Sequence, residues 1–168
     1  MKQNRPRIEL QKTTADQRLD LIIIGITIAM ICMPLYFYTQ LPDIISIHFN
    51  AAGEVDGHGS KQLIWIIPVI GILMYLGMNQ LLKFPHTFNY PTKVTEENAE
   101  RLYKSAVKMM RYILLFTQLV ILFIIIATIY SALQSGKSLL GPWFLITVLL
   151  TSIGIPLILS YRMSTDMK

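Results

Sequence analysis

The stretch ILLFTQLVILFIIIATI, residues 113–129, decides the fold class because it contains no charged side chain. It belongs to one of four windows that lack Asp, Glu, Lys, Arg and His, at residues 21–42, 62–82, 112–136 and 138–161. About 20 apolar residues in a helix span the roughly 30 Å of hydrocarbon in a bilayer. The sequence therefore predicts an all-α membrane protein with four transmembrane helices.

The overall composition favours the same class. Hydrophobic residues make up 53% of the chain and charged residues 15%, whereas a soluble domain has about 25% charged residues. A soluble four-helix bundle would carry a polar stripe along each helix, and the four windows carry none. Basic residues precede the first window but no small-residue cleavage site follows it, so we expect an uncleaved anchor rather than a signal peptide.

The net charge of +5 could suggest a nucleic-acid partner, but topology explains it better. All but two of the 15 cations, Lys61 and Lys137, lie in the two tails and in the connection 83–111. The positive-inside rule places these segments in the cytoplasm. We therefore expect a multi-pass protein of the bacterial cytoplasmic membrane with both termini cytoplasmic, in contact with the lipid bilayer and not with nucleic acid.

The predicted organisation follows from these boundaries. Residues 1–20 form a polar cytoplasmic tail that is loosely ordered, and residues 83–111 form the cytoplasmic connection. The remaining segments are the first two helices at 21–82, with an ordered extracytoplasmic loop at 41–61 between them, the last two helices at 112–161, and a short cytoplasmic tail at 162–168.

The stretch HFNAAGEVDGHGSK, residues 48–61, is the most polar part of the external loop. A connection of this length exceeds the two to eight residues usual in helix bundles, and long ordered loops often bind ligands. Three interpretations stay open: a turn built by Asn, Asp and Gly, with Ser60 capping the next helix; a metal site; and a ligand- or partner-binding loop. The candidate ligand-binding residues are His48, Asn50, Asp56, His58, Ser60 and Lys61.

Other chemistry finds little support in the sequence. The zinc-protease pattern HExxH and the nucleophile pattern GxSxG are absent. The order of Gly, Ser and Lys at 53–61 is wrong for a phosphate loop. No window holds an ionisable side chain of the kind that coupled transporters need at membrane depth. We therefore expect no enzymatic activity and no cofactor. The polar side chains within the windows, Asn79, Gln80, Thr117 and Gln118, are expected to bond between helices or to lie at the interface.

The cytoplasmic connection is expected to contain an amphipathic helix at 95–111 that continues into the third transmembrane helix. Thr95 is a plausible N-cap, and Glu100 and Lys104 have the spacing and order of a favourable helix pair. The basic end at Lys108 and Arg111 suits anionic lipid headgroups. The helix is either a solvated lever or a docking surface for a cytoplasmic protein, with Arg101, Lys104 and Lys108 as candidate contacts.

One family pattern runs through the first two helices and their loop. It comprises Leu41-Pro42-Asp43, Ile47-His48-Phe49-Asn50, Gly53, Asp56-Gly57, Gly59-Ser60-Lys61 and Pro68. Residues 20–82 thereby resemble the bacterial membrane-protein family known as domain of unknown function 1648, and residues 84–112 resemble a small subgroup of it. The same domain occurs at the N-terminus of membrane immunity proteins. Those proteins protect bacteria from a sporulation-delay toxin and hold a repressor at the membrane. The resemblance implies a binding role rather than an enzymatic one.

Taken together, the sequence favours an immunity-like or signalling module. His48, Asn50 and Asp56 would hydrogen-bond an extracytoplasmic peptide or small ligand, and the response would pass through the second helix to residues 95–111. Two alternatives remain: a metal-dependent membrane enzyme that uses His48, His58 and Asp56, and an accessory subunit of a membrane transport complex.

Overall fold

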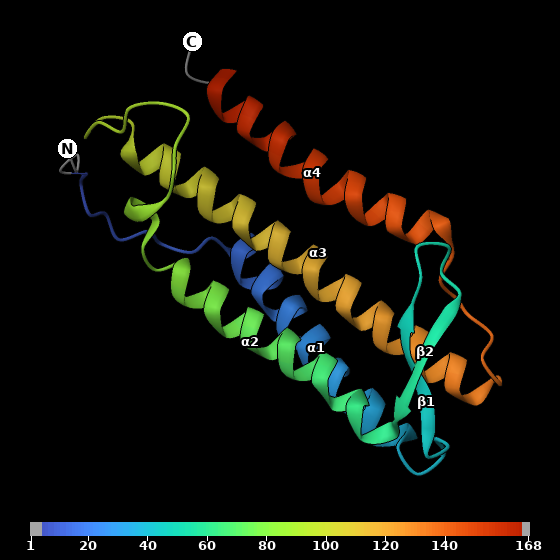
Figure 1. Ribbon diagram of the computed structural model, residues 1–168. Helices are drawn as coiled ribbons and strands as arrows, with labels where there is room; N and C mark the ends of the chain where they lie inside the picture. The colour runs from blue at the N-terminus through green and yellow to red at the C-terminus, as the bar shows by residue number, and fades with distance from the viewer. Residues whose placement is uncertain (1–4, 166–168) are drawn as a thin grey trace.

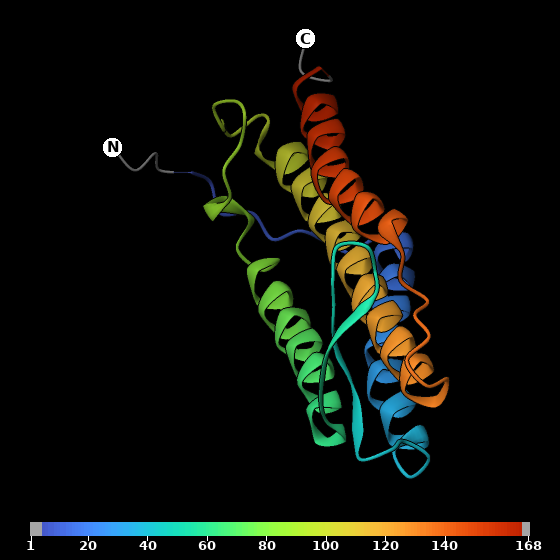
Figure 2. The same cartoon turned by 45° about the vertical axis from the view of Figure 1, so that its right-hand side comes forward.

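The computed structural model describes residues 5–165, which form an elongated bundle of helices with a small β-hairpin at one end (Figure 1). The helices lie side by side along one long axis, as a second view confirms (Figure 2). In chain order the elements are α1 (Thr14–Phe37), β1 (Ile44–Phe49), β2 (Val55–Ser60), the 3-10 turn η1 (Lys61–Trp65), α2 (Ile66–Leu81), the 3-10 turn η2 (Pro85–Thr87), α3 (Ala99–Leu133) and α4 (Pro142–Thr165).

Three helical segments of the described chain are long and apolar enough to cross a membrane. They are Thr14–Phe37, Lys61–Leu81 and Ala99–Leu133, with mean hydropathies of 2.2, 1.7 and 2.6. Even in Ala99–Leu133 only 39% of the most apolar window is buried within the protein, so most of these side chains face outward. A monomeric soluble protein rarely exposes so large an apolar surface to water. The mainly helical, multi-pass membrane fold is therefore confirmed, while the fourth helix offers a shorter apolar segment, Pro142–Ile158.

Helix α1 begins earlier than the sequence analysis expected. Thr13 caps it: the hydroxyl accepts a hydrogen bond from the Asp16 amide at 3.2 Å, and the Asp16 carboxylate accepts one from the Thr13 amide at 2.9 Å. This reciprocal capping box satisfies backbone donors that the first turn would otherwise leave unpaired. The prediction of a loosely ordered tail up to residue 20 is wrong for residues 14–20, because they are the first turns of α1.

The segment before α1 is also held in place, by the connection between α2 and α3. Arg5 donates hydrogen bonds to the carbonyls of His86 and Phe88, at 3.1 and 2.5 Å. Its guanidinium lies 5.6 Å from the ring centroid of Tyr90, whose pKa burial raises. The Tyr103 hydroxyl donates to the Pro6 carbonyl at 3.0 Å. These contacts order residues 5–13 against the start of α3.

Helix α3 is one continuous helix of 35 residues. The prediction that the amphipathic segment continues into a transmembrane helix is confirmed, and Glu100 and Lys104 form the expected ion pair at 2.6 Å. The predicted start at Thr95 is wrong, since α3 begins at Ala99. The Thr95 amide donates instead to the Asn98 side chain at 2.8 Å, which holds residues 95–98 in a turn ahead of the helix.

The sequence suggested that Arg111 lies at an exposed basic end of the helix, but its guanidinium is buried and paired within the protein. Arg111 is only 5% exposed, and its side chain points into the protein. Its Nε donates to Asp20 at 2.9 Å and its Nη1 to Asp16 at 3.1 Å. Both carboxylates belong to α1, so this clamp of Arg111, Asp16 and Asp20 joins α1 to α3 where their apolar segments begin.

The helices pack closely at mid-depth around Gly71 of α2. A β-carbon there would lie 2.9 Å from the Met30 side chain of α1. The Gln118 amide of α3, fully buried, donates to the Gly71 carbonyl at 3.0 Å. The expectation that Gln118 bonds between helices is confirmed. Asn79 instead donates to the Tyr75 carbonyl within α2, at 2.9 Å.

Replacing Arg111 by Ala is expected to lower the free energy of unfolding by about 3 kcal/mol, because it removes the buried cation that pairs with two partly buried carboxylates. Asp20 would keep only its bond to Lys12. Thermal unfolding of the purified protein in a mild detergent measures this. The matched control is Lys104→Ala, which removes an exposed ion pair and should leave the melting temperature nearly unchanged. Equal melting temperatures for the parent and Arg111→Ala would show that the clamp does not stabilise the bundle.

Candidate functional site

The loop between α1 and α2 folds into an antiparallel hairpin of β1 and β2. Ile44 pairs with Ser60 at its base and Phe49 with Val55 near its tip, with irregularities on either side of His48. The sequence predicted an all-α fold with a loop at this position, so the hairpin adds a small sheet to the helical fold. Within residues 5–165 this sheet has two strands.

Asn50 builds the tip of the hairpin. Its side-chain oxygen accepts hydrogen bonds from the amides of Ala52 and Glu54, at 2.9 and 3.0 Å, and its amide donates to the Glu54 carboxylate at 3.0 Å. An Asn side chain that mimics a backbone turn in this way stabilises a reversal of the chain. The polar atoms of this predicted ligand-binding residue are thus engaged in shaping the loop.

Gly53 presses the tip onto the connection between α3 and α4. Its φ of +82° lies in the left-handed region, which residues with a side chain rarely adopt. A β-carbon at this position would lie 2.4 Å from the carbonyl carbon of Leu140. Only Gly therefore fits both the backbone conformation and the close approach.

Lys61 closes the base of the hairpin. Its ammonium lies 3.0 Å from the Asp43 carboxylate and 5.5 Å from the ring centroid of Tyr38, while its amide donates to the Asp43 carbonyl at 2.9 Å. Ser60, expected to cap the next helix with its side chain, makes no such hydrogen bond. The turn η1 follows Ser60 directly, and Lys61 is the residue that fixes this junction.

Strand β1 anchors the hairpin to the end of α3. Ile45 is buried in a cluster with Ile64, Ile125 and Ile129. The hydroxyls of Ser46 and Ser131, both buried, lie 2.9 Å apart and share a hydrogen bond. Sequence reasoning did not select these two serines, because nothing in either local pattern reveals a partner so far away along the chain.

The outward face of the hairpin is polar. Asp56, His58 and Ser60 alternate with less exposed residues along β2, and alternate residues of a strand share a face. A carboxylate oxygen of Asp56 lies 2.5 Å from the Nδ1 atom of His48. The Asp56 side chain is 43% exposed and the His48 side chain 70%. Four of the six predicted ligand-binding residues thus face outward together, whereas Asn50 and Lys61 hold the hairpin in shape.

The metal interpretation requires a set of ligands that the hairpin does not assemble. No three His, Cys, Asp or Glu side chains among residues 5–165 lie close enough to hold a metal ion. The structure therefore does not bring His48, His58 and Asp56 of the described chain together as a set of metal ligands.

The candidate partner-binding residues lie on the first turns of α3. Arg101, Lys104 and Lys108 are all exposed, and spacings of three and four place them along one side of the helix. Lys104 is bound to Glu100. These residues form a basic stripe at the opposite end of α3 from the hairpin.

Comparison with known proteins finds a family match over the hairpin. Residues 25–72 match the family model described as Domain of unknown function (DUF1648). The matched segment is less than a third of the chain and covers the second half of α1, the whole hairpin, η1 and the start of α2. The resemblance noted in the sequence is therefore confirmed for the part that carries the candidate site.

More distant comparisons add little about function. An uncharacterized protein of Archaeoglobus fulgidus is 33% identical over 82 residues, covering 44% of this chain and 43% of that protein. The match therefore spans less than half the length of this relative. No solved structure matches the chain significantly.

Replacing Gly53 by Ala is expected to destabilise the protein by about 2 kcal/mol, because the new methyl group strains the backbone and meets the Leu140 carbonyl. Thermal unfolding in detergent measures the loss. Gly77→Ala is the control, since a β-carbon there meets no atom within 4 Å and Ala favours a helix interior. If the two variants unfold at the same temperature, the tip does not press on the α3–α4 connection.

Proposed function

We propose that this protein is a non-enzymatic binding module of the bacterial cytoplasmic membrane, with an immunity-like or signalling role. In this proposal α4 is the fourth transmembrane helix, both termini are cytoplasmic, and the hairpin lies outside. Its ligand is an extracytoplasmic peptide or small protein. The observation that carries the proposal is a polar, outward-facing hairpin surface fixed rigidly to the membrane bundle.

The orientation rests on the distribution of charge. Lys12 and Arg18 belong to the segment before α1 and to its first turns, and Lys83 and Lys93 to the connection between α2 and α3. These segments lie at the end of the bundle opposite the hairpin (Figure 1). Cytoplasmic segments carry such an excess of Lys and Arg. With the hairpin at the other end, the polar face of β2 is exposed to the extracytoplasmic space.

The hairpin offers two modes of recognition at once. Within the described chain no third strand pairs with β2, so its outer edge presents backbone donors and acceptors to an extended peptide. Asp56, His58 and Ser60 project beside that edge and can select side chains of the peptide. The His48–Asp56 pair adds a carboxylate and an imidazole that hydrogen-bond polar groups in either direction.

A response to the ligand has a direct structural route through α3. Ser46 of β1 bonds to Ser131 near the end of this helix, and α3 continues without a break to Ala99. A shift of the hairpin would therefore displace the other end of α3. That end carries the basic stripe of Arg101, Lys104 and Lys108, where a cytoplasmic protein would dock. This route replaces the second helix as the preferred connection between the two ends.

Site-specific photo-crosslinking in living cells tests the ligand. A photoreactive amino acid at His58 is expected to capture one extracytoplasmic peptide or protein, identified by mass spectrometry. Asp56→Ala should weaken that adduct. The control position is Tyr36, 72% exposed on α1, which should capture lipid. If His58 yields the same lipid adducts as Tyr36, or adducts within the chain alone, the hairpin has no such partner.

The orientation has its own test. In a Cys32→Ser background, a membrane-impermeant maleimide should label the His58→Cys variant in intact cells. The Lys93→Cys variant, in the cytoplasmic connection, should react after permeabilisation and not before. The opposite labelling pattern would place the hairpin in the cytoplasm and overturn the proposed extracytoplasmic ligand.

A further inference from the structure

A cavity of about 520 Å³ lies at the end of the bundle opposite the hairpin. The segment before α1 forms one wall, the end of α2 a second, and the first turns of α3 a third. Its lining combines apolar side chains such as Leu82 and Val107 with basic ones such as Lys83, Lys108 and Arg111. Its volume is in the range typical of small-molecule sites.

The cavity is positioned at a membrane boundary. The charge-free windows begin after Asp20 and Arg111 and end before Lys83. Arg111 and Lys83 line the cavity, and Asp20 binds Arg111. The polar-to-apolar transitions of three helices therefore meet at this level, where phospholipid headgroups lie.

The charges around the cavity do not cancel. Asp16 and Asp20 neutralise Arg111, Asp20 also binds Lys12, and Glu100 binds Lys104.

The side-chain ammonium groups of Lys83 and Lys108 make no hydrogen bond or ion pair with any residue of the described range 5–165, and Lys108 interacts with the Asp16 carboxylate only through space. Glu9, an exposed side chain, is the other acid in the lining. Two ammonium groups from different helices are therefore available to an anion.

A groove on the outer side of the bundle adjoins the same lysine. It has a volume of about 470 Å³, and Lys108 lines both it and the cavity, together with Ala15 and Asp16. The groove is otherwise lined by residues such as Leu19, Ile22 and Tyr112. Ile22 and Tyr112 are 54% and 42% exposed and begin the apolar spans.

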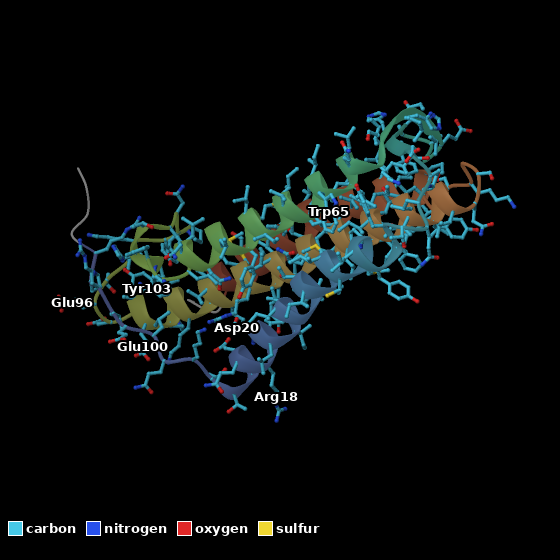
Figure 3. The ribbon with its side chains drawn as sticks, turned by 90° about the horizontal axis from the view of Figure 1, so that it is seen from below. Arg18, Asp20, Trp65, Glu96, Glu100 and Tyr103 are labelled. Carbon is cyan, nitrogen blue, oxygen red and sulfur yellow. The ribbon has the colours of Figure 1, made fainter. Side chains whose placement is uncertain are left out.

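Arg18, which also lines this groove, points away from the bundle (Figure 3). A polar cavity and a lipid-facing groove thus meet at Lys108.

We infer that this cavity binds the headgroup of an anionic phospholipid. Its phosphate lies between Lys83 and Lys108, and its acyl chains leave along the groove of Leu19, Ile22 and Tyr112. A basic pocket between membrane helices at the headgroup level is suited to such a lipid. The inference goes beyond the role of the hairpin and does not depend on the hairpin's ligand.

Lipid binding to the full chain in mild detergent tests this inference. Native mass spectrometry with dioleoyl-phosphatidylglycerol should show a retained lipid, and dioleoyl-phosphatidylcholine should bind much more weakly. Each lysine near the headgroup contributes about fivefold in affinity, so the Lys83→Gln/Lys108→Gln double variant should bind phosphatidylglycerol about 25-fold more weakly. The Lys83→Arg/Lys108→Arg variant keeps the charge and should retain binding.

The matched control is Lys93→Gln/Lys137→Gln, which removes the same charge from exposed positions outside the cavity. It should bind phosphatidylglycerol as the parent does. An equal loss in the control would show a general effect of surface charge and overturn the site. So would equal binding of both lipids, or displacement of phosphatidylglycerol by millimolar inorganic phosphate, which would identify a soluble phosphate as the occupant. The melting temperature of each lipid-free variant shows that loss of binding does not reflect unfolding.

Discussion

The clamp of Arg111 with Asp16 and Asp20 is the interaction on which the rest of the bundle depends. A guanidinium that is almost fully buried needs both carboxylates, because an unpaired charge in this environment would cost several kcal/mol. The pairing fixes how far α1 is displaced along α3. It also brings the starts of the apolar spans of α1 and α3 to one level, beside the basic cavity.

The same register positions the hairpin at the far end. Helix α1 ends at Phe37, and the chain then turns into β1, whose Ser46 meets Ser131 near the end of α3. Gly53 at the tip reaches the connection to α4. The hairpin is therefore a fixed part of the bundle rather than a mobile loop, and α3 links its surface to the basic stripe at the other end.

Sequence reasoning succeeded where local pattern determines structure. The apolar windows predicted the three helices that are long and apolar enough to cross a membrane. Helix spacing predicted the Glu100–Lys104 pair, and a polar side chain among apolar ones predicted the bond of Gln118 between helices. The early start of α1 could also have been predicted from the sequence, since Thr13 and Asp16 have the spacing of a capping box.

The hairpin and the burial of Arg111 could not be predicted from the sequence, because both depend on residues distant in the chain. The Gly-rich sequence of β2 has low strand propensity and is held by its packing on β1. For the same reason the sequence could select Asn50 and Lys61 as polar loop residues, but not show that they shape the hairpin while His48, Asp56, His58 and Ser60 face outward.

The most direct measurement is a disulfide test of hairpin docking in a Cys32→Ser background. Ser46→Cys with Ser131→Cys should crosslink fully under mild oxidation, while Ile47→Cys with Ser131→Cys, from an exposed neighbour, should not. If the first pair stays reduced in membranes and reacts with thiol reagents, the hairpin is not docked on α3 and the proposed link between the two ends of the protein is wrong.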